Sequence, residues 1–274
     1  MERRITVLFS IVVLLFSLCV FRIYYVQASA GLATAATVQG RYYLEIAAGR
    51  GTVYDRDFSP LVNDRNRYVA AVLPTPQAAS ELLRVMPEER RASILGQLSG
   101  GLPFVTEVPE NSIYASGIDI FEVPVRYPEE NQLAPHLIGY LGDEGKTGAA
   151  GIERAFDAEL SDAGPRLEAR YQTDASGRTM RGGGVEILRE NETGAGGVVL
   201  TLKREIQELV QEALLAGCEK GAAVVLDVKS GDILAMASIP AFDQNDVAAS
   251  LESADSPFIN RATSGYNIGS VFKL

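Results

Sequence analysis

The strongest hydrophobic pattern in the chain is a run near its N-terminus. Residues Ile5 to Phe21 carry no formal charge, and as a helix rising about 1.5 Å per residue they span roughly 25 Å. Continuing the helix past Arg22, whose charged head can extend to the interface, reaches the roughly 30 Å of a bilayer core. Arg3 and Arg4 precede the run. This pattern predicts a transmembrane anchor over residues 1–27, with a cytoplasmic N-terminus and an exported body at the plasma membrane.

A cleaved signal peptide is the alternative interpretation of this run. Ala28, Ser29 and Ala30 have the small-x-small form of a cleavage site. The apolar run is longer than the usual core of a signal peptide and is followed by Arg22. These features favour an uncleaved anchor, and both interpretations place the body of the protein outside the membrane.

Hydrophobic periodicity after the anchor predicts a mixed domain of helices and strands over residues 28–192. Alternating segments predict strands, helical spacing predicts helices, and prolines mark an edge strand and a helix break. We expect a juxtamembrane helix or stalk over 27–48, a short strand around Val53, a strand at 67–73, a helical pair over 77–98 broken near Pro87, an edge strand at 117–126 containing Pro124, an amphipathic helix from Gly151 that buries Ala155, Phe156 and Leu160, and a hairpin followed by a linker over 161–197.

A second unit is predicted over residues 193–274. Thr201 is a plausible N-cap for a helix that ends at Gly217. Its apolar face is predicted to contain Ile206, Leu209, Val210, Ala213 and Leu214. Two apolar runs, 222–228 and 233–239, flank the turn residues 229–232 and predict a β-hairpin.

Composition narrows the functional classes. The formal net charge of −10 argues against a nucleic-acid partner, because a phosphate-binding surface is basic. Cys19 and Cys218 are too few and too differently placed to form a disulfide framework. His136 is the only histidine, so we expect a structural role for it and expect neither a metal site nor a cofactor.

Two short motifs in residues 142–153 mimic catalytic ones. Gly145, Lys146 and Thr147 imitate the end of a phosphate-binding loop, but Tyr140 stands where the first glycine of that loop belongs. Lys146, Thr147 and Gly148 also spell the K-T-G triplet of penicillin-interactive serine enzymes. In those enzymes the triplet follows the nucleophile, whereas here it precedes the candidate serine by more than a hundred residues. We therefore expect neither motif to be catalytic.

The candidate chemistry lies at Ser270 and Lys273, which form an S-x-x-K tetrad. Residues three apart are neighbours on a helix surface, so the lysine amine can reach the serine hydroxyl. An amine kept neutral by burial can accept the hydroxyl proton and activate the serine as a nucleophile. The tetrad alone is a weak signal, because serine and lysine are common residues.

The order of several motifs resembles the class B penicillin-binding proteins, the monofunctional peptidoglycan D,D-transpeptidases of division, elongation and sporulation. The resemblance runs from the anchor to the last residue. It is carried by Arg50-Gly51-x-Val53-x-Asp55-Arg56, Arg126-x-Pro128, His136-x-x-Gly139-Tyr140, Gly148-x-x-Gly151-x-Glu153, the segment from Gly221 to Asn245, Asn260-Arg261-Ala262, and Gly269-Ser270 with Lys273. One departure is Asp57-Phe58, where the family usually has Asn-Gly in a turn.

The resemblance implies an α+β fold in three parts: a transmembrane anchor (1–27), a non-catalytic pedestal or dimerisation domain (28–192), and the first helix and hairpin of a transpeptidase domain with the serine β-lactamase-like fold (193–274). It also implies that Ser270 is acylated by the penultimate D-alanine of a stem peptide and by β-lactams, with Lys273 as general base and the Ser270 N–H as an oxyanion donor. The implied partners are peptidoglycan stem peptides, β-lactams, membrane lipid and other wall-synthesis membrane proteins such as a glycosyltransferase.

The resemblance further implies structural roles in the pedestal for Arg50, Gly51, Asp55, Arg56, Gly151 and Glu153. Arg50 and Glu153 are hypothesised to form an ion pair.

The family's downstream S-x-N and K-T-G motifs do not follow Ser270 in the 274 residues. From this we expect an incomplete chain that is inactive as a transpeptidase. Two alternatives remain open from the sequence: a non-enzymatic, membrane-anchored scaffold of the wall-synthesis machinery, and a β-lactam sensor or β-lactamase relative.

Overall fold

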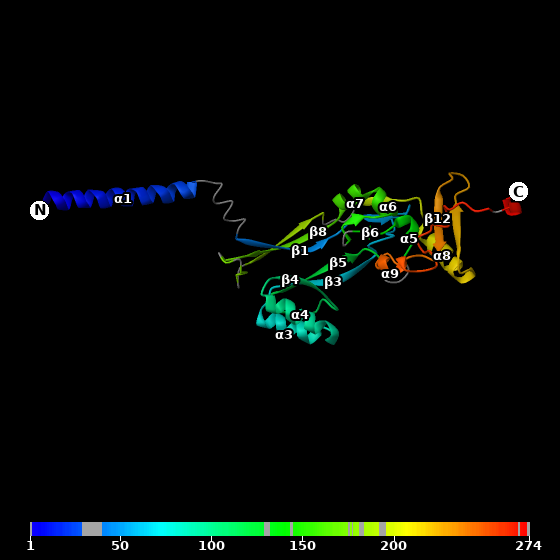
Figure 1. The fold of residues 1–274 in the computed structure, drawn as a ribbon, viewed down its shortest axis with the longest axis horizontal. Helices are drawn as coiled ribbons and strands as arrows, with labels where there is room; N and C mark the ends of the chain where they lie inside the picture. Colours follow the sequence, from blue (N-terminus) through cyan, green and yellow to red (C-terminus); the bar gives the residue numbers. More distant parts are fainter. Residues whose placement is uncertain are drawn as a thin grey trace. The chain divides into compact units, whose positions relative to one another are not determined.

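A computed structural model describes residues 2–28, 40–128, 132–142, 145–174, 176, 178–180, 184–191, 196–267 and 269–272. Contacts between Cα atoms divide the chain into two units, one formed by residues 1–44 with 170–186 and the other by 45–169 with 187–274. The structure has an α+β fold, as predicted, and contains a mixture of helices and small sheets (Figure 1).

The first unit contains the N-terminal helix α1 (Glu2–Ala28). Within α1, Arg3–Tyr25 are long and apolar enough to cross a membrane. The helix forms because the run contains neither proline nor glycine, and its leucine, valine and isoleucine side chains lie exposed around the helix. Such all-round hydrophobicity is typical of a helix surrounded by lipid.

A three-stranded sheet with the order β1-β8-β9 has strands that contribute residues to both units. Its strands are β1 (Arg41–Ala48), β8 (Arg166–Gln172) and β9 (Val185–Glu190). The predicted helix or stalk over 27–48 is therefore wrong for residues 41–48, where burial alternates with the two-residue period of a strand. Residues 29–39 lie outside the described residues.

An antiparallel sheet in the second unit has the order β4-β3-β5 and packs on two helices. Its elements are β3 (Arg65–Val72), α3 (Pro76–Val85), α4 (Glu88–Gly100), β4 (Phe104–Val108) and β5 (Ile118–Val125). The two helices lie together on one side of β3 and β4 (Figure 1). The helical pair broken at Pro87 and the edge position of β5 are confirmed, whereas β4 was not predicted.

The rest of the second unit places the pedestal motifs beside the C-terminal elements. The short segments before residue 192 are β2 (Thr52–Tyr54), α5 (Pro135–Ile138), β6 (Leu141–Gly142), β7 (Thr147–Gly148), α6 (Gly151–Ala155) and α7 (Asp157–Ala163). After residue 192 come strand β10 (Gly197–Val199), helix α8 (Arg204–Gly217), strands β11 (Gly221–Leu226) and β12 (Ile233–Ile239), and helix α9 (Val247–Leu251). Strand β10 pairs in parallel with β2. The predicted hairpin is confirmed as the antiparallel pair β11–β12, and α8 packs on β12.

The predicted helix from Gly151 is corrected in two respects. It divides at Phe156 into α6 and α7. Ala155 and Phe156 are exposed, while Leu160 and the charged Glu153 are fully buried. The spacing of apolar residues cannot predict that Glu153 is buried, because the burial of a charged residue depends on partners from other segments.

The predicted start and apolar face of α8 are also partly wrong. The helix begins at Arg204, and the Thr201 hydroxyl donates to the Ile233 carbonyl instead of capping the helix. Leu209 and Ala213 are exposed, whereas the polar Gln207 is fully buried. The helix does end at Gly217, as predicted.

Candidate functional site

Ser270 lies in a short 3₁₀ helix, η2 (Gly269–Phe272), and is exposed. Gly269, directly before it, has a φ of +54°, a left-handed conformation that suits glycine. Lys273 lies outside the described residues. The Ser270–Lys273 geometry therefore stays a prediction.

The segment before Ser270 is attached to strand β12. The hydroxyl of Ser238 donates to the carbonyl of Ile259 at 3.2 Å and accepts the N–H of Arg261 at 3.0 Å. Ser264 donates its hydroxyl to the carbonyl of Asn260 at 2.8 Å, which closes the turn that follows. These contacts connect the chain leading to Ser270 with the hairpin.

In the pedestal, Glu153 lies at the centre of a buried charge network. The predicted ion pair is confirmed, with Arg50 Nε 3.3 Å from Glu153 Oε2. Arg126 Nε donates to Glu153 Oε1 at 2.7 Å, and the Tyr127 hydroxyl donates to the same oxygen at 3.0 Å. Arg50 also donates to Asp157 Oδ1 at 2.8 Å. Each buried charge thus has a partner of opposite sign, the condition under which buried charges are tolerated.

This network shifts the pKa values of two of its members. Burial, followed by the Glu153 charge, raises the pKa of the Tyr127 hydroxyl above its ordinary value and keeps it protonated as a donor. The hydrogen bond from the Gly148 N–H, followed by the bond from Arg50, lowers the pKa of the Asp157 carboxyl. The network also includes Arg126, Tyr127 and Asp157. The sequence analysis predicted no role in it for these three residues, although Asp157 stands four residues after Glu153.

The two motif glycines allow close backbone approach. The Gly51 N–H donates to Leu160 O at 2.6 Å, and a Cβ at this position would lie 2.8 Å from the Cβ of Ala163. Gly151 has a φ of +60°, and a Cβ there would lie 2.5 Å from Leu137 O. Larger residues would therefore force the backbone apart at both positions.

Asp55 and Arg56 follow β2 and differ in their environments. Asp55 is 2% exposed and accepts three backbone N–H groups through its carboxylate. The Arg56 N–H donates to Leu202 O at 2.9 Å, while its side chain is exposed.

Lys146, Thr147 and Gly148, the K-T-G triplet, contribute to the pedestal network through their backbone. The Lys146 carbonyl accepts from Arg50 at 2.9 Å, and the Gly148 N–H donates to Asp157 at 2.7 Å. Thr147 and Gly148 form β7, which pairs with β6. These backbone contacts give the triplet a structural role in the pedestal.

His136 packs in an aromatic cluster. Its Nε2 lies 2.6 Å from Pro257 O, and its ring lies edge-on to Phe242 at 5.4 Å. Burial lowers the pKa of the imidazole, and the Arg261 charge adds to this effect against the opposing Pro257 contact. These contacts fit the structural role expected for His136.

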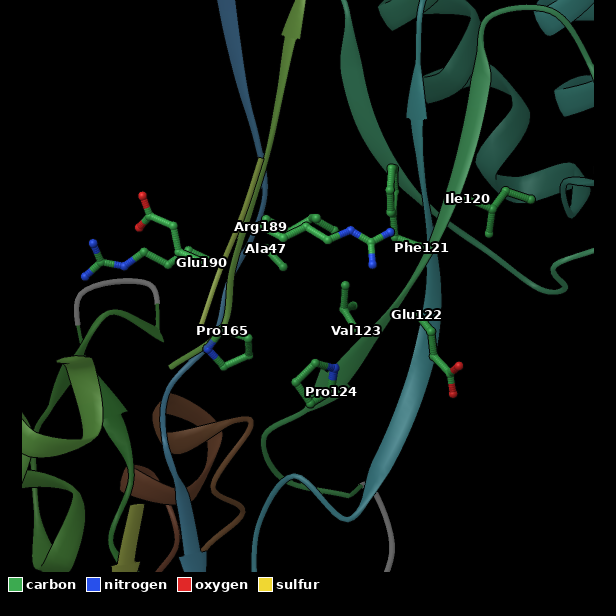
Figure 2. A pocket seen from close by; sticks show the side chains of 11 residues that line it. Ala47, Ile120, Phe121, Glu122, Val123, Pro124, Pro165, Arg189 and Glu190 are labelled. Carbon is green, nitrogen blue, oxygen red and sulfur yellow. The ribbon is translucent and has the colours of Figure 1, made fainter. Parts of the chain in front are cut away.

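One cavity, of about 440 Å³, lies away from Ser270, between β5 and the segments around Ala47, Pro165 and Arg189. Figure 2 shows Phe121, Val123 and Pro124 on one side of it, with Ala47 and Pro165 opposite. Its lining residues include no serine, cysteine, lysine or histidine, so they offer no nucleophile or imidazole for acyl transfer. Among the residues that the structure describes, no group of three or more His, Cys, Asp or Glu residues could hold a metal ion.

Comparison with known proteins finds similarity to penicillin-binding transpeptidases. The model of the penicillin-binding protein transpeptidase domain matches residues 221–274, which include both tetrad residues. The chain is 27% identical over 310 aligned residues to peptidoglycan D,D-transpeptidase MrdA of Salmonella typhimurium, covering 96% of this chain and 49% of the relative. These matches support a class B penicillin-binding transpeptidase.

Two further comparisons agree with this assignment. Peptidoglycan D,D-transpeptidase PbpA of Mycolicibacterium smegmatis is 32% identical over 169 residues, covering 54% of this chain and 30% of the relative. The solved structure of the penicillin-binding protein PBP2 from Helicobacter pylori matches with a TM-score of 0.50 at 19% identity, over 80% of this chain and 49% of that chain, and supports the fold. The chain thus spans about half the length of the MrdA relative it matches.

Proposed function

We propose that this chain belongs to a class B penicillin-binding protein that cross-links peptidoglycan stem peptides as a D,D-transpeptidase, with Ser270 as the acylated nucleophile. The observation that carries the proposal is the match of the transpeptidase-domain model to residues 221–274, within which Ser270 and Lys273 have the S-x-x-K spacing. The exposure of Ser270 supports it, because an acyl donor must reach the hydroxyl.

The proposed reaction has two acyl-transfer steps. The Ser270 Oγ attacks the carbonyl of the penultimate D-alanine, Lys273 accepts the hydroxyl proton, and the terminal D-alanine leaves with a proton on its amine. The amine of a second stem peptide then attacks the ester carbonyl, forms the cross-linking amide and releases Ser270 with its proton restored. The Ser270 N–H is one donor to the oxyanion in both steps.

We further propose the placement and partners of the protein. Helix α1 anchors it in the plasma membrane, and Arg3 and Arg4 keep the N-terminus cytoplasmic, so the pedestal and Ser270 lie outside. There Ser270 can meet stem peptides and β-lactams, and the pedestal can contact other wall-synthesis membrane proteins such as a glycosyltransferase. The domain boundaries at 27/28 and 192/193 belong to the same proposal.

Labelling with a fluorescent penicillin tests the nucleophile. The polypeptide that carries these residues is expressed in its native cell, and membranes are labelled before electrophoresis. Ser270→Ala is expected to abolish the label, because no acyl-enzyme can form. Ser80→Ala is the matched control, since Ser80 is exposed on α3 and is expected to leave labelling intact. Loss of label in both variants, or in neither, would contradict the assignment.

We also propose that the 274 residues alone do not suffice for acylation. The S-x-N and K-T-G motifs that complete such a site do not follow Ser270 in this sequence. A recombinant polypeptide of 274 residues is expected to take up far less than one penicillin per chain. Stoichiometric uptake that Ser270→Ala removes would show this expectation to be wrong.

A further inference from the structure

Asp55 joins the pedestal to the first helix of the transpeptidase region. Its Oδ1 accepts the N–H groups of Asp57 at 2.9 Å and Ser59 at 2.7 Å, both within its own loop. Its Oδ2 accepts the N–H of Arg204 at 3.0 Å, which is 149 residues away in sequence. One carboxylate oxygen therefore organises the pedestal loop, and the other binds the first residue of α8.

Helix α8 depends on this external acceptor at its start. Lys203 stands at the N-cap, and its side chain makes no capping hydrogen bond. A helix begins with N–H groups that lack partners within the helix, and a carboxylate there also interacts favourably with the helix dipole. Asp55 thus supplies the acceptor that Lys203 does not, and its charge adds to that of Glu205 in the first turn. The Arg204 side chain reinforces the contact by donating to Asp64 Oδ2 at 2.8 Å.

The first turn of α8 positions β12 through Gln207. The Gln207 N–H donates to Lys203 O at 2.9 Å, the bond that closes this turn. The fully buried Gln207 amide then binds Met236 of β12 on both sides, donating to its carbonyl at 3.0 Å and accepting its N–H at 2.8 Å. Leaving a buried amide without hydrogen-bond partners destabilises the folded state. The Gln207 amide therefore holds α8 and β12 in one register.

Strand β12 in turn holds the segment that leads to Ser270. Two residues after Met236, the Ser238 hydroxyl binds Ile259 O and the Arg261 N–H. A continuous series of hydrogen bonds and covalent links therefore runs from Asp55 through α8 and β12 to residues 259–261. The contacts of Asp55, of the Gln207 amide and of the Ser238 hydroxyl each join two different segments, so displacement of one segment affects the next.

We propose that Asp55 is a positioning residue for Ser270 and acts through the N-terminus of α8. The inference rests on the proposed role of Ser270 as nucleophile. In this proposal, the hydrogen bond that Asp55 accepts from Arg204 keeps the first turn of α8 closed and keeps the Gln207 side chain bound to β12. Loss of this bond opens the turn and loosens the attachment of residues 259–261.

Hydrogen–deuterium exchange of the full 274-residue chain in detergent micelles tests this directly. Asp55→Asn retains an oxygen for the two loop N–H groups but places an amide N–H₂ where Oδ2 accepts from Arg204. Losing a helix cap is expected to speed local opening about fivefold. We expect that acceleration in peptides covering α8, β12 and residues 258–267, with α3 and α4 unchanged.

Two further variants separate positioning from a local structural role. Asp227→Asn is the matched control, because Asp227 Oδ1 likewise accepts two loop N–H groups, from Lys229 and Ser230, in a hairpin turn. It is expected to leave α8 and residues 258–267 unchanged. Lys203→Ser added to Asp55→Asn gives α8 a local N-cap, and it is expected to restore protection of α8, β12 and residues 258–267.

The proposal is overturned if Asp55→Asn accelerates exchange only in its own loop, if all peptides including α3 and α4 accelerate equally, or if Lys203→Ser restores nothing. Exchange is read without any reaction at Ser270. Its outcome is therefore separate from penicillin labelling, and failure of the proposed function would appear only in the labelling experiment.

Discussion

Replacing Glu153 with glutamine tests whether the buried charge network stabilises the pedestal. The Glu153 side chain is fully buried and receives hydrogen bonds from Arg50, Arg126 and Tyr127. Glutamine retains the shape but removes the charge and turns one acceptor oxygen into a donor facing N–H groups. The two guanidinium groups, 5% and 12% exposed, then lose their shared counter-charge.

The expected cost follows from these contacts. Removing one partner of a buried ion pair costs about 3–5 kcal/mol. Hydrogen bonds to charged groups contribute about 1.5–3 kcal/mol each, and Arg50 keeps Asp157 as a second partner. We therefore expect Glu153→Gln to lower the free energy of unfolding by about 3–5 kcal/mol. With a urea slope of about 3 kcal/mol/M, the midpoint falls by about 1–1.7 M.

Urea unfolding of the full chain in micelles, followed by the near-ultraviolet circular dichroism of its tyrosines, measures this shift. The chain has no tryptophan, and its tyrosines include the buried Tyr127. Glu81→Gln is the matched control, because it removes the exposed pair of Glu81 with Arg84 at 2.8 Å and is expected to cost only about 0.3 kcal/mol. Equal midpoint shifts for Glu153→Gln and Glu81→Gln would refute the reasoning.

Three other predictions, one of which compares two substitutions, can be measured in the same assay. His136→Gln removes a group whose lowered pKa makes the folded state bind fewer protons than the unfolded state, so the wild-type stability loss as pH falls below about 6.5 is expected to flatten; an unchanged pH profile would contradict this. Gly51→Ala is expected to cost about 1–3 kcal/mol through its clash with Ala163, whereas Gly96→Ala in α4, with open space around its Cβ, is expected to stabilise by about 0.5–1 kcal/mol; equal effects would exclude the clash. Leu82→Ala is expected to cost about 2–5 kcal/mol by opening a cavity in a fully buried site, and a loss below about 1 kcal/mol would show that the α3–α4 core tolerates it.

Elements with a strong local signal were predictable from the sequence. The N-terminal helix, the α3–α4 pair divided by Pro87 and the β11–β12 hairpin each depend on hydrophobic periodicity, proline or a turn within the segment itself. The edge position of β5 followed from Pro124, since proline cannot donate to a neighbouring strand.

The incorrect elements depend on distant partners. Thr201 has the chemistry of an N-cap, but the acceptor at the start of α8 comes from Asp55, far away in sequence. From the sequence, Gln207 is expected on the exposed side of a helix. It is buried because its amide pairs with two backbone groups of β12. Periodicity counts apolar residues, so it misses polar residues that are buried because another segment satisfies them.

The candidate site, too, was predictable from the sequence only in part. The S-x-x-K spacing predicts Ser270 and Lys273 as the candidate catalytic pair, and the resemblance predicted the Arg50–Glu153 pair that the structure confirms. The contribution of Arg126 and Tyr127 to that pair became apparent only from the folded chain, because the three segments meet through tertiary packing. Arg126 belongs to the Arg126-x-Pro128 motif, but that motif names no partner for it, and Tyr127 occupies the variable position of the motif.

The most direct test of the central claim is the position of the penicillin adduct. Native membranes containing the polypeptide are treated with benzylpenicillin and digested with trypsin, and the peptide spanning Ala262 to Lys273 is fragmented in a mass spectrometer. The account predicts a penicilloyl mass increment on Ser270 and an unmodified Ser264. An adduct on another residue, or an unmodified peptide under conditions that acylate other penicillin-binding proteins in the same membranes, would contradict it.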